Sequence, residues 1–319
     1  MAEDLDKEKQ KKREQYQLWI NDNIIEGKNF IKAKRYRDAW NRLVRIYDFN
    51  LPCPELEPLL IQCEQAMGWP KRAPELVEMM KRYLGCPGRL FDPQPDAHLH
   101  MAAYKRAWKS GQKKGFVPVF VSVNNLEHLM EMLVENADPE AKRMEDFSVE
   151  RVQRYRKELL SKPLPDGTDV LKSRVSSMDL EEEANWFGSL PTGGGIHNEF
   201  LSLFHTGEGT KQVILAKIPV KNPWEVFAWL PMGSWNAAPD PLEMMEVAKS
   251  WYERFGAVPA AVSGDEVEFY METPAGRNLT NEELKGLAME HHAFAPDTWE
   301  GIIDTSTLKR CRYWYFWWD

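Results

Sequence analysis

The chain of 319 residues has few cysteines and no long apolar run. Neither a C-x-x-C pair nor a dense disulfide pattern is present, so reduced thiols are expected at the four cysteines Cys53, Cys63, Cys86 and Cys311. No segment approaches the ~18 consecutive apolar residues of a membrane-spanning helix. The first residues, MAEDLDKEKQKKREQ, lack the apolar core of a secretory signal. We therefore expect a cytoplasmic protein with no membrane partner.

An excess of basic residues is also absent. Lys and Arg number 41 against 49 Asp and Glu, which gives a formal net charge of −8 at pH 7, and the acidic excess lies after residue 85. Because nucleic-acid-binding domains carry basic surfaces, an acidic body argues against nucleic acid as the main partner. The expected partner is another protein.

Residues 1–87 are predicted to form a helical, repeat-like module. From Trp19 to Tyr47 the apolar residues keep helical spacing, with one interruption that predicts a helical hairpin. A second helical pair is expected over 54–85, where prolines mark the helix starts and Gly85 marks the end. The spacing weakly resembles that of tetratricopeptide repeats, and a nonrepetitive helical bundle is the alternative.

Residues 88–210 are predicted to combine a linker with a strand and helix that belong to the C-terminal domain. The proline-rich stretch CPGRLFDPQPDAHLHM is typical of a linker or an ordered loop. FVPVFVSV and LEHLMEMLVENA then follow as a buried strand and an amphipathic helix. Gly193, Gly194 and Gly195 indicate a surface loop that lacks the sequence of a phosphate-binding loop.

Residues 211–319 alternate between strand and helix patterns. KQVILAKIPV and WEVFAWLPM are predicted strands, PLEMMEVAKSWYERFGA and NEELKGLAMEHHAF are predicted helices, and VPAAVSG with DEVEFYMETP predicts a hairpin. Six consecutive aromatic residues, Tyr313 to Trp318, give a strand two apolar faces, which favours a position in the middle of a sheet. The predicted class is α+β, with a mixed sheet and a buried aromatic C-terminal strand.

Four motifs occur together in this last third. They are GSWN followed by a proline, WYERFGA, AMEHHAFAPD and the terminal WYFWWD. Their order resembles the bacterial family known as domain of unknown function 4253. The resemblance implies an α+β fold, a bacterial or phage origin and no established activity. At two positions where such domains often carry cysteine this sequence has Ala238 and Ala295, so the resemblance implies no thiol or metal role there.

A candidate binding pocket is predicted where the Trp-Asn loop, the turn after the last long helix and the final strand open onto one edge of the sheet. Polar loop residues at a sheet edge are a common place for ligand binding, and the alternative is that each residue only caps a helix, forms a turn or fills the core. Three of the residues, Asn236, Asp297 and Asp319, are expected within about 12 Å of one another. The full candidate set is Trp235, Asn236, Glu290, His291, His292, Asp297 and Asp319.

No metal and no cofactor is expected. His291 and His292 are adjacent, so on a regular helix they project about 100° apart and cannot chelate one ion together. Asp96, His98 and His100 would share one face of an extended segment, which suits a metal, but the nearby prolines make a regular strand doubtful.

Two functions follow from these observations. The first is a noncatalytic bacterial protein-binding module, and an immunity-like or antitoxin-like role towards a basic toxin would fit the acidic charge. The alternative is a hydrolase that uses the histidine and carboxylate cluster near the Trp-Asn loop, although the cluster matches no known catalytic constellation. Binding is favoured over catalysis.

Overall fold

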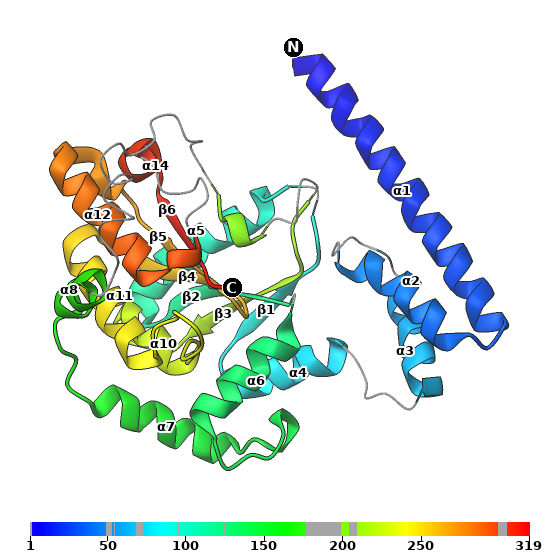
Figure 1. Cartoon of the computed structure of the whole chain (residues 1–319), viewed down its shortest axis with the longest axis horizontal. Helices are drawn as coiled ribbons and strands as arrows, with labels where there is room; N and C mark the ends of the chain where they lie inside the picture. Colours follow the sequence, from blue (N-terminus) through cyan, green and yellow to red (C-terminus); the bar gives the residue numbers. More distant parts are fainter. Residues whose placement is uncertain are drawn as a thin grey trace.

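The computed structural model has the predicted α+β fold, in which helices pack on a six-stranded mixed sheet (Figure 1). The part of the chain that the structure describes comprises residues 2–48, 53, 55–67, 73–94, 96–123, 125–176, 199–203, 209–298 and 305–319. In this part, none of the helices combines the length and the apolar character that crossing a membrane requires. The glycine run at 193–195 lies outside the described residues.

The sheet joins strands from distant parts of the sequence in the order β1-β3-β2-β4-β5-β6. Only β2 and β4 run parallel, and the other neighbours are antiparallel. All six residues of β2 are buried, as expected for a β-branched strand at the centre of a sheet. The strands are β1 Gly88–Phe91, β2 Val117–Ser122, β3 Val213–Ile218, β4 Val258–Val262, β5 Glu266–Tyr270 and β6 Tyr313–Trp317.

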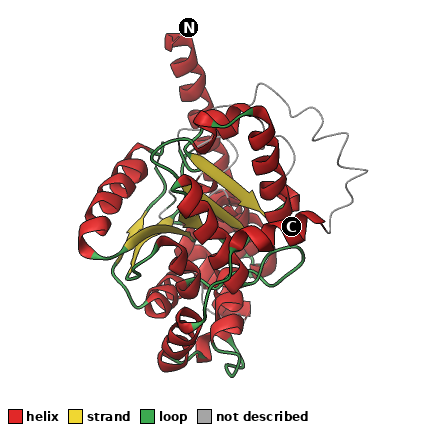
Figure 2. Ribbon diagram, turned by 90° about the vertical axis from the view of Figure 1, so that its left-hand side faces the viewer, coloured by secondary structure: helices red, strands yellow, loops and turns green. Residues whose placement is uncertain are grey.

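Helices cover both faces of the sheet (Figure 2). One face packs against the helices α4, α6, α7, α10, α11 and α12 in the larger core, and the other packs against α5 and the short helix η2. The elements after the N-terminal helices are α5 His98–Lys114, α6 Leu126–Ala137, η1 Met144–Asp146, α7 Val149–Ser161, α8 Gly167–Ser176, η2 Leu201–Leu203, η3 Pro223–Glu225, α10 Val226–Trp229, α11 Pro241–Phe255, η4 Ala275–Asn278, α12 Asn281–Phe294, η5 Pro296–Thr298 and α14 Thr305–Arg310.

The four N-terminal helices divide between two cores. Helices α1 (Ala2–Lys32), α2 (Tyr36–Asp48) and α3 (Leu56–Met67) enclose a small core of their own. Helix α4 (Ala73–Leu84) instead contributes Val77, Met80 and Tyr83 to the larger core beside α6 and α7. The two helices of the predicted second pair, α3 and α4, therefore lie in different cores. We call α1–α3 the helical module.

Two stretches differ from their predicted structure. The proline-rich segment was expected to be a loop, yet its residues 88–91 form the edge strand β1 paired with β3. WEVFAWLPM was expected to be a strand, yet it forms η3 and α10. Its helical start is encoded just upstream, because Asn222 and Glu225 make a capping box around Pro223 at the first helical position.

The aromatic strand β6 is buried on both faces, but its predicted central position is wrong. It is the last strand in the sheet order and pairs with β5. Trp314 and Phe316 point into the larger core, and Tyr313 points into the core beneath α5. The open edge is protected by Thr298, whose hydroxyl accepts from the Trp317 N–H over 2.7 Å and donates to the Trp317 carbonyl over 2.9 Å. The Thr298 side chain thus makes the two hydrogen bonds to Trp317 that a neighbouring strand would otherwise make.

Candidate functional site

The structure brings Asn236, Asp297 and Asp319 together at one edge of the sheet, as expected. The Asn236 side-chain amide donates to the main-chain oxygen of Asp319 over 2.5 Å. The main-chain N–H of Asp319 donates to the Asp297 carboxylate over 3.1 Å. All three residues are exposed, so their remaining donors and acceptors face solvent. We call these three residues the edge cluster.

The loop that carries Asn236 is tightly shaped. Gly233, Ser234 and Asn236 all have positive φ, of 101°, 71° and 43°. At Gly233 a Cβ atom would lie 1.9 Å from the Pro239 carbonyl oxygen, so no other residue fits without a backbone shift. A left-handed backbone conformation with positive φ costs non-glycine residues about 1 to 2 kcal/mol. The loop therefore holds the Asn236 amide in a conformation that its local backbone alone does not favour.

Trp235 contributes packing to this edge more than an accessible surface. Its ring is half-buried and lies edge-on to Trp318, with centroids 6.3 Å apart, and to His128, with centroids 6.4 Å apart. Edge-to-face contacts of this kind add stability beyond area burial. The tryptophan thereby ties the loop to the end of β6 and to α6.

Glu290 and His291 lie in different surroundings: Glu290 contacts residues of α11, and His291 lies in the core. Glu290 accepts hydrogen bonds from the Trp251 indole over 3.1 Å and from Arg254 over 2.8 Å. His291 is buried, and its ring lies 4.4 Å from that of Trp314. Burial lowers its pKa to about 3, so the imidazole is neutral at pH 7. His292, one position on, is half-buried.

His98 and His100 do not share a face, because α5 begins at His98. Two residues along a helix turn the side chain by about 200°. The His98 side chain is 94% exposed and lies 3.1 Å from the Asp96 carboxylate, whereas His100 is fully buried between Phe91 and Phe120. In the described part of the chain, no group of three or more His, Cys, Asp or Glu side chains is placed to hold a metal ion.

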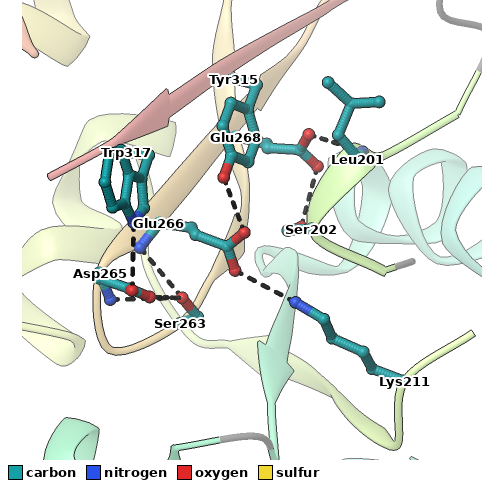
Figure 3. A network of polar contacts seen from close by, with 9 residues as sticks. All are labelled: Leu201, Ser202, Lys211, Ser263, Asp265, Glu266, Glu268, Tyr315 and Trp317. Atoms are coloured by element: carbon teal, nitrogen blue, oxygen red, sulfur yellow. Dashed lines mark hydrogen bonds and ion pairs between the residues drawn. The ribbon is translucent and has the colours of Figure 1, made fainter. Parts of the chain in front are cut away.

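A second polar cluster, on the α5 face of the sheet, was not anticipated from the sequence. Glu268 lies on β5 beside residues 201 and 202 (Figure 3) and is fully buried. Its two carboxyl oxygens accept hydrogen bonds from the Leu201 N–H over 2.7 Å and from the Ser202 hydroxyl over 2.9 Å. Burial raises the pKa of this carboxyl to about 8, so it carries a proton at neutral pH. A carboxyl group with so large a shift is a candidate functional group.

Glu266 lies on the same face of β5 in a different setting. Its carboxylate accepts from the Tyr315 hydroxyl over 2.8 Å and forms an ion pair with Lys211 over 3.5 Å (Figure 3). The loop before it adds Asp265, which accepts from the Trp317 indole over 3.2 Å. We call these residues, together with Glu268 and Ser202, the β5 network.

The sequence contained one signal for this network. In DEVEFY the acidic residues alternate with Val267 and Phe269, which gives a strand one polar and one apolar face. Alternation of this kind normally indicates a face in water. Here the polar face is covered by residues 199–203, which come from a part of the sequence without a readable pattern, so the burial of Glu268 could not be predicted.

The C-terminal third has the order of elements and motifs described above, and the comparison with known families agrees. Residues 214–319 match the family described as a domain of unknown function (DUF4253). No curated protein and no solved structure matches the chain. The resemblance of the N-terminal helices to tetratricopeptide repeats is not confirmed. The DUF4253 segment contains the whole edge cluster and most of the β5 network, but Ser202 and Lys211 come from outside it.

Proposed function

We propose that this protein is a noncatalytic protein-binding module of the bacterial cytoplasm, and that it docks its partner on α1. The observation that carries the proposal is a pair of exposed apolar side chains on that helix. Leu18 is 64% exposed and Ile25 is 58% exposed, more than any other large apolar residue in the described part of the chain. Exposed apolar patches mark protein-contact sites, and these two residues would supply the apolar part of such a patch.

The two residues share one face of α1. They are seven positions apart, which is about two helical turns, and the exposed Asp22 lies between them. The opposite face carries Ile20 and Ile24, which are buried in the core of the helical module. Figure 1 shows α1 on the outside of the molecule, away from the sheet. The helical module thus stabilises α1 on one side and leaves the other for a partner.

The charge of the protein favours a basic partner. The net charge is −8, and because the acidic excess lies after residue 85, the attraction comes from the body of the protein and not from α1. At α1 itself, the exposed carboxylate of Asp22 stands between the two apolar contacts. Acidic surfaces speed the association of basic proteins and discriminate against acidic ones. Neutralisation of a basic toxin, as by an immunity protein or antitoxin, is one form that such binding takes.

The hydrolase alternative stays a prediction, and the proposal does not build on it. Its central imidazole, His291, is surrounded by aromatic rings, and its buried Nε2 atom has no hydrogen-bond partner among the described residues. Its carboxylate Glu290 is already engaged by Arg254. Neither group is poised towards the edge cluster as a general acid or base would be.

The proposal is tested with three versions of the full chain as bait. Wild type, the double variant Leu18→Ser/Ile25→Ser and the control Leu160→Ser, which removes an exposed leucine from α7, are exposed to lysate of cells that naturally express the protein. A protein retained by wild type and by the control is then purified, and its binding is measured by calorimetry. We expect the double variant to bind at least about tenfold more weakly, as for loss of a small apolar hot spot.

Equal binding of that protein by wild type and the double variant would show that α1 is not the docking face. Absence of any protein retained by wild type in stoichiometric amount contradicts the binding proposal itself. Circular dichroism of each variant establishes that the helical module is intact, because the two substituted side chains are exposed and their loss should leave the fold unchanged.

A further inference from the structure

Residues 199–203, which we call the strap, lie across the α5 face of the sheet and close it. Phe200, Ser202 and Leu203 are buried. The Phe200 ring lies edge-on to three other rings, with centroid distances of 5.1 Å to Tyr104, 5.8 Å to Phe120 and 4.9 Å to Tyr313. The strap therefore fills a place in the aromatic layer between α5 and the strands β2 and β6.

Polar contacts fasten the strap at both of its sides. The Leu203 carbonyl accepts from the Lys211 N–H over 2.6 Å. On the other side, the Leu201 N–H and the Ser202 hydroxyl both donate to Glu268 (Figure 3). Of these groups only the Glu268 carboxyl is ionisable. An ionised carboxylate would accept both bonds as well, so the proton changes the cost of burying Glu268 beneath the strap and not the bonds themselves.

The surroundings of Glu268 disfavour its ionised form. The nearby lysine, Lys211, pairs with Glu266, which shares the face of β5 with Glu268. The ionisable groups that interact with Glu268 in the described part of the chain are Glu266 of β5 and Tyr313 and Tyr315 of β6, and none of these is a cation. A buried carboxylate without a cation is costly, and exposure to water removes that cost.

We propose that the strap is a proton-dependent closure, which covers the α5 face while Glu268 is protonated and opens when Glu268 ionises. Opening carries Phe200 away from Tyr104, Phe120 and Tyr313 and uncovers an aromatic surface that is buried in the closed form. The device is independent of the docking face on α1, since the two share no residue.

The direction of the pH effect follows from proton linkage. The closed state holds the Glu268 proton with a pKa of about 8, whereas a hydrated glutamate has its ordinary value of 4.5. The population of the open state relative to the closed state therefore increases as pH rises from 4.5 to about 8, and it stays constant above about pH 8. The opening equilibrium should rise by roughly tenfold per pH unit from pH 6 to 7.5 and level off above about pH 8.

Hydrogen exchange of the full chain, followed by mass spectrometry at several pH values from 6 to 9, measures this equilibrium. Each rate is divided by the intrinsic exchange rate at that pH, and the strap is compared with α11 as an internal reference. In wild type we expect the corrected exchange of the strap to rise with pH and to be faster than that of α11 at every pH, because the strap opens without global unfolding. Glu268→Gln should abolish the rise, and the matched variant Glu266→Gln should keep it.

Three results would overturn the proposal. One is a corrected exchange of the strap that does not change with pH in wild type. Another is the same pH dependence in Glu268→Gln, which would assign the proton to a different group. The third is equal corrected exchange of the strap and α11 at every pH, which would mean that the whole domain opens and not the strap alone.

Discussion

The indole N–H of Trp318 donates a hydrogen bond of 3.1 Å to the main-chain oxygen of Phe294, and the two rings lie edge-on with centroids 5.3 Å apart. This contact joins the end of β6 to the last turn of α12. Helix ends leave carbonyl groups without intrahelical partners, so the indole satisfies an acceptor that would otherwise be buried and unpaired. The edge cluster lies directly beside this junction, since Asp319 follows Trp318 and contacts both Asn236 and Asp297.

Replacement of Trp318 by alanine should lower the free energy of unfolding by about 3 to 5 kcal/mol, or abolish soluble expression, because it removes a buried ring and leaves a cavity. Chemical denaturation monitored by circular dichroism measures the change. Tyr252→Ala is the control, since Tyr252 is a partly exposed aromatic residue on α11 and its loss should cost about 1 kcal/mol. An unchanged midpoint in Trp318→Ala would contradict the anchoring role of β6.

Glu268 should make the fold less stable as pH rises. Its pKa is raised to about 8 in the folded chain from 4.5, so its stabilising effect is complete below pH 4.5 and is lost as pH rises through 8. The loss is on the order of 4 kcal/mol across this range. Denaturation of wild type and Glu268→Gln at several pH values gives two curves whose difference isolates this group. Parallel curves would show that Glu268 is not protonated in the folded chain.

His291 should have the opposite effect. Its pKa is lowered to about 3 from 6.5, so its contribution is complete above pH 6.5 and is lost as pH falls through 3. The buried imidazole stays neutral down to about pH 3, whereas the imidazole of the unfolded chain is protonated below pH 6.5. The free energy of unfolding therefore falls by on the order of 4 kcal/mol between pH 6.5 and pH 3. His291→Leu should weaken this acid sensitivity, whereas replacement of the exposed His98 should not. Identical acid denaturation of wild type and His291→Leu would refute the assignment.

Asn236 allows the backbone and side-chain contributions of the Trp-Asn loop to be separated. Asn236→Gly keeps the positive φ and loses only the hydrogen bond to Asp319, which should cost about 0.5 to 1.5 kcal/mol. Asn236→Ala loses the bond and also strains the backbone, which adds about 1 to 2 kcal/mol. Thermal unfolding of both variants gives the comparison. Equal melting temperatures for the two would mean that the loop relaxes out of its left-handed conformation.

The C-terminal segment 211–319 should fail to fold on its own. It contains β3, whose only strand partners in the described structure are β1 and β2, and both of these lie upstream. A longer segment, 73–319, keeps all six strands and α4 and should unfold cooperatively without the helical module. Denaturant titration of both segments is the measurement. A cooperative transition in 211–319 would show that β3 finds another place in the sheet.

Local sequence signals predicted the elements whose structure depends on nearby residues. The hairpin of β4 and β5 was predicted from residues within a few positions. The helices α11 and α12 were also predicted, and the structure ends α11 at Gly256 and caps α12 with Thr280. WEVFAWLPM was misread because its apolar run fits a strand and its helical start lies outside it, at Asn222. Attention to the residues before an apolar run would have corrected this prediction.

Which apolar side chains are exposed depends on tertiary contacts that the sequence does not show. Ile24 and Ile25 both fit the helical pattern of α1, yet Ile24 is 7% exposed and Ile25 is 58% exposed. The edge cluster was predictable because loops after successive elements of an open sheet share its edges. Glu268 was not, because the strap that covers it is joined to β5 only through tertiary contacts.

The central position of β2 also affects how the chain folds while it is being synthesised. Its partners β3 and β4 follow long after it in the sequence, so a ribosome that adds roughly 5 to 20 residues per second needs several seconds to supply them. During that time VPVFVS, a segment made almost entirely of apolar residues, has no strand beside it. Exposed apolar side chains of this kind favour aggregation, whereas Pro118 removes one main-chain donor from strand pairing. The nascent chain is thus a natural client for a chaperone until β4 has emerged.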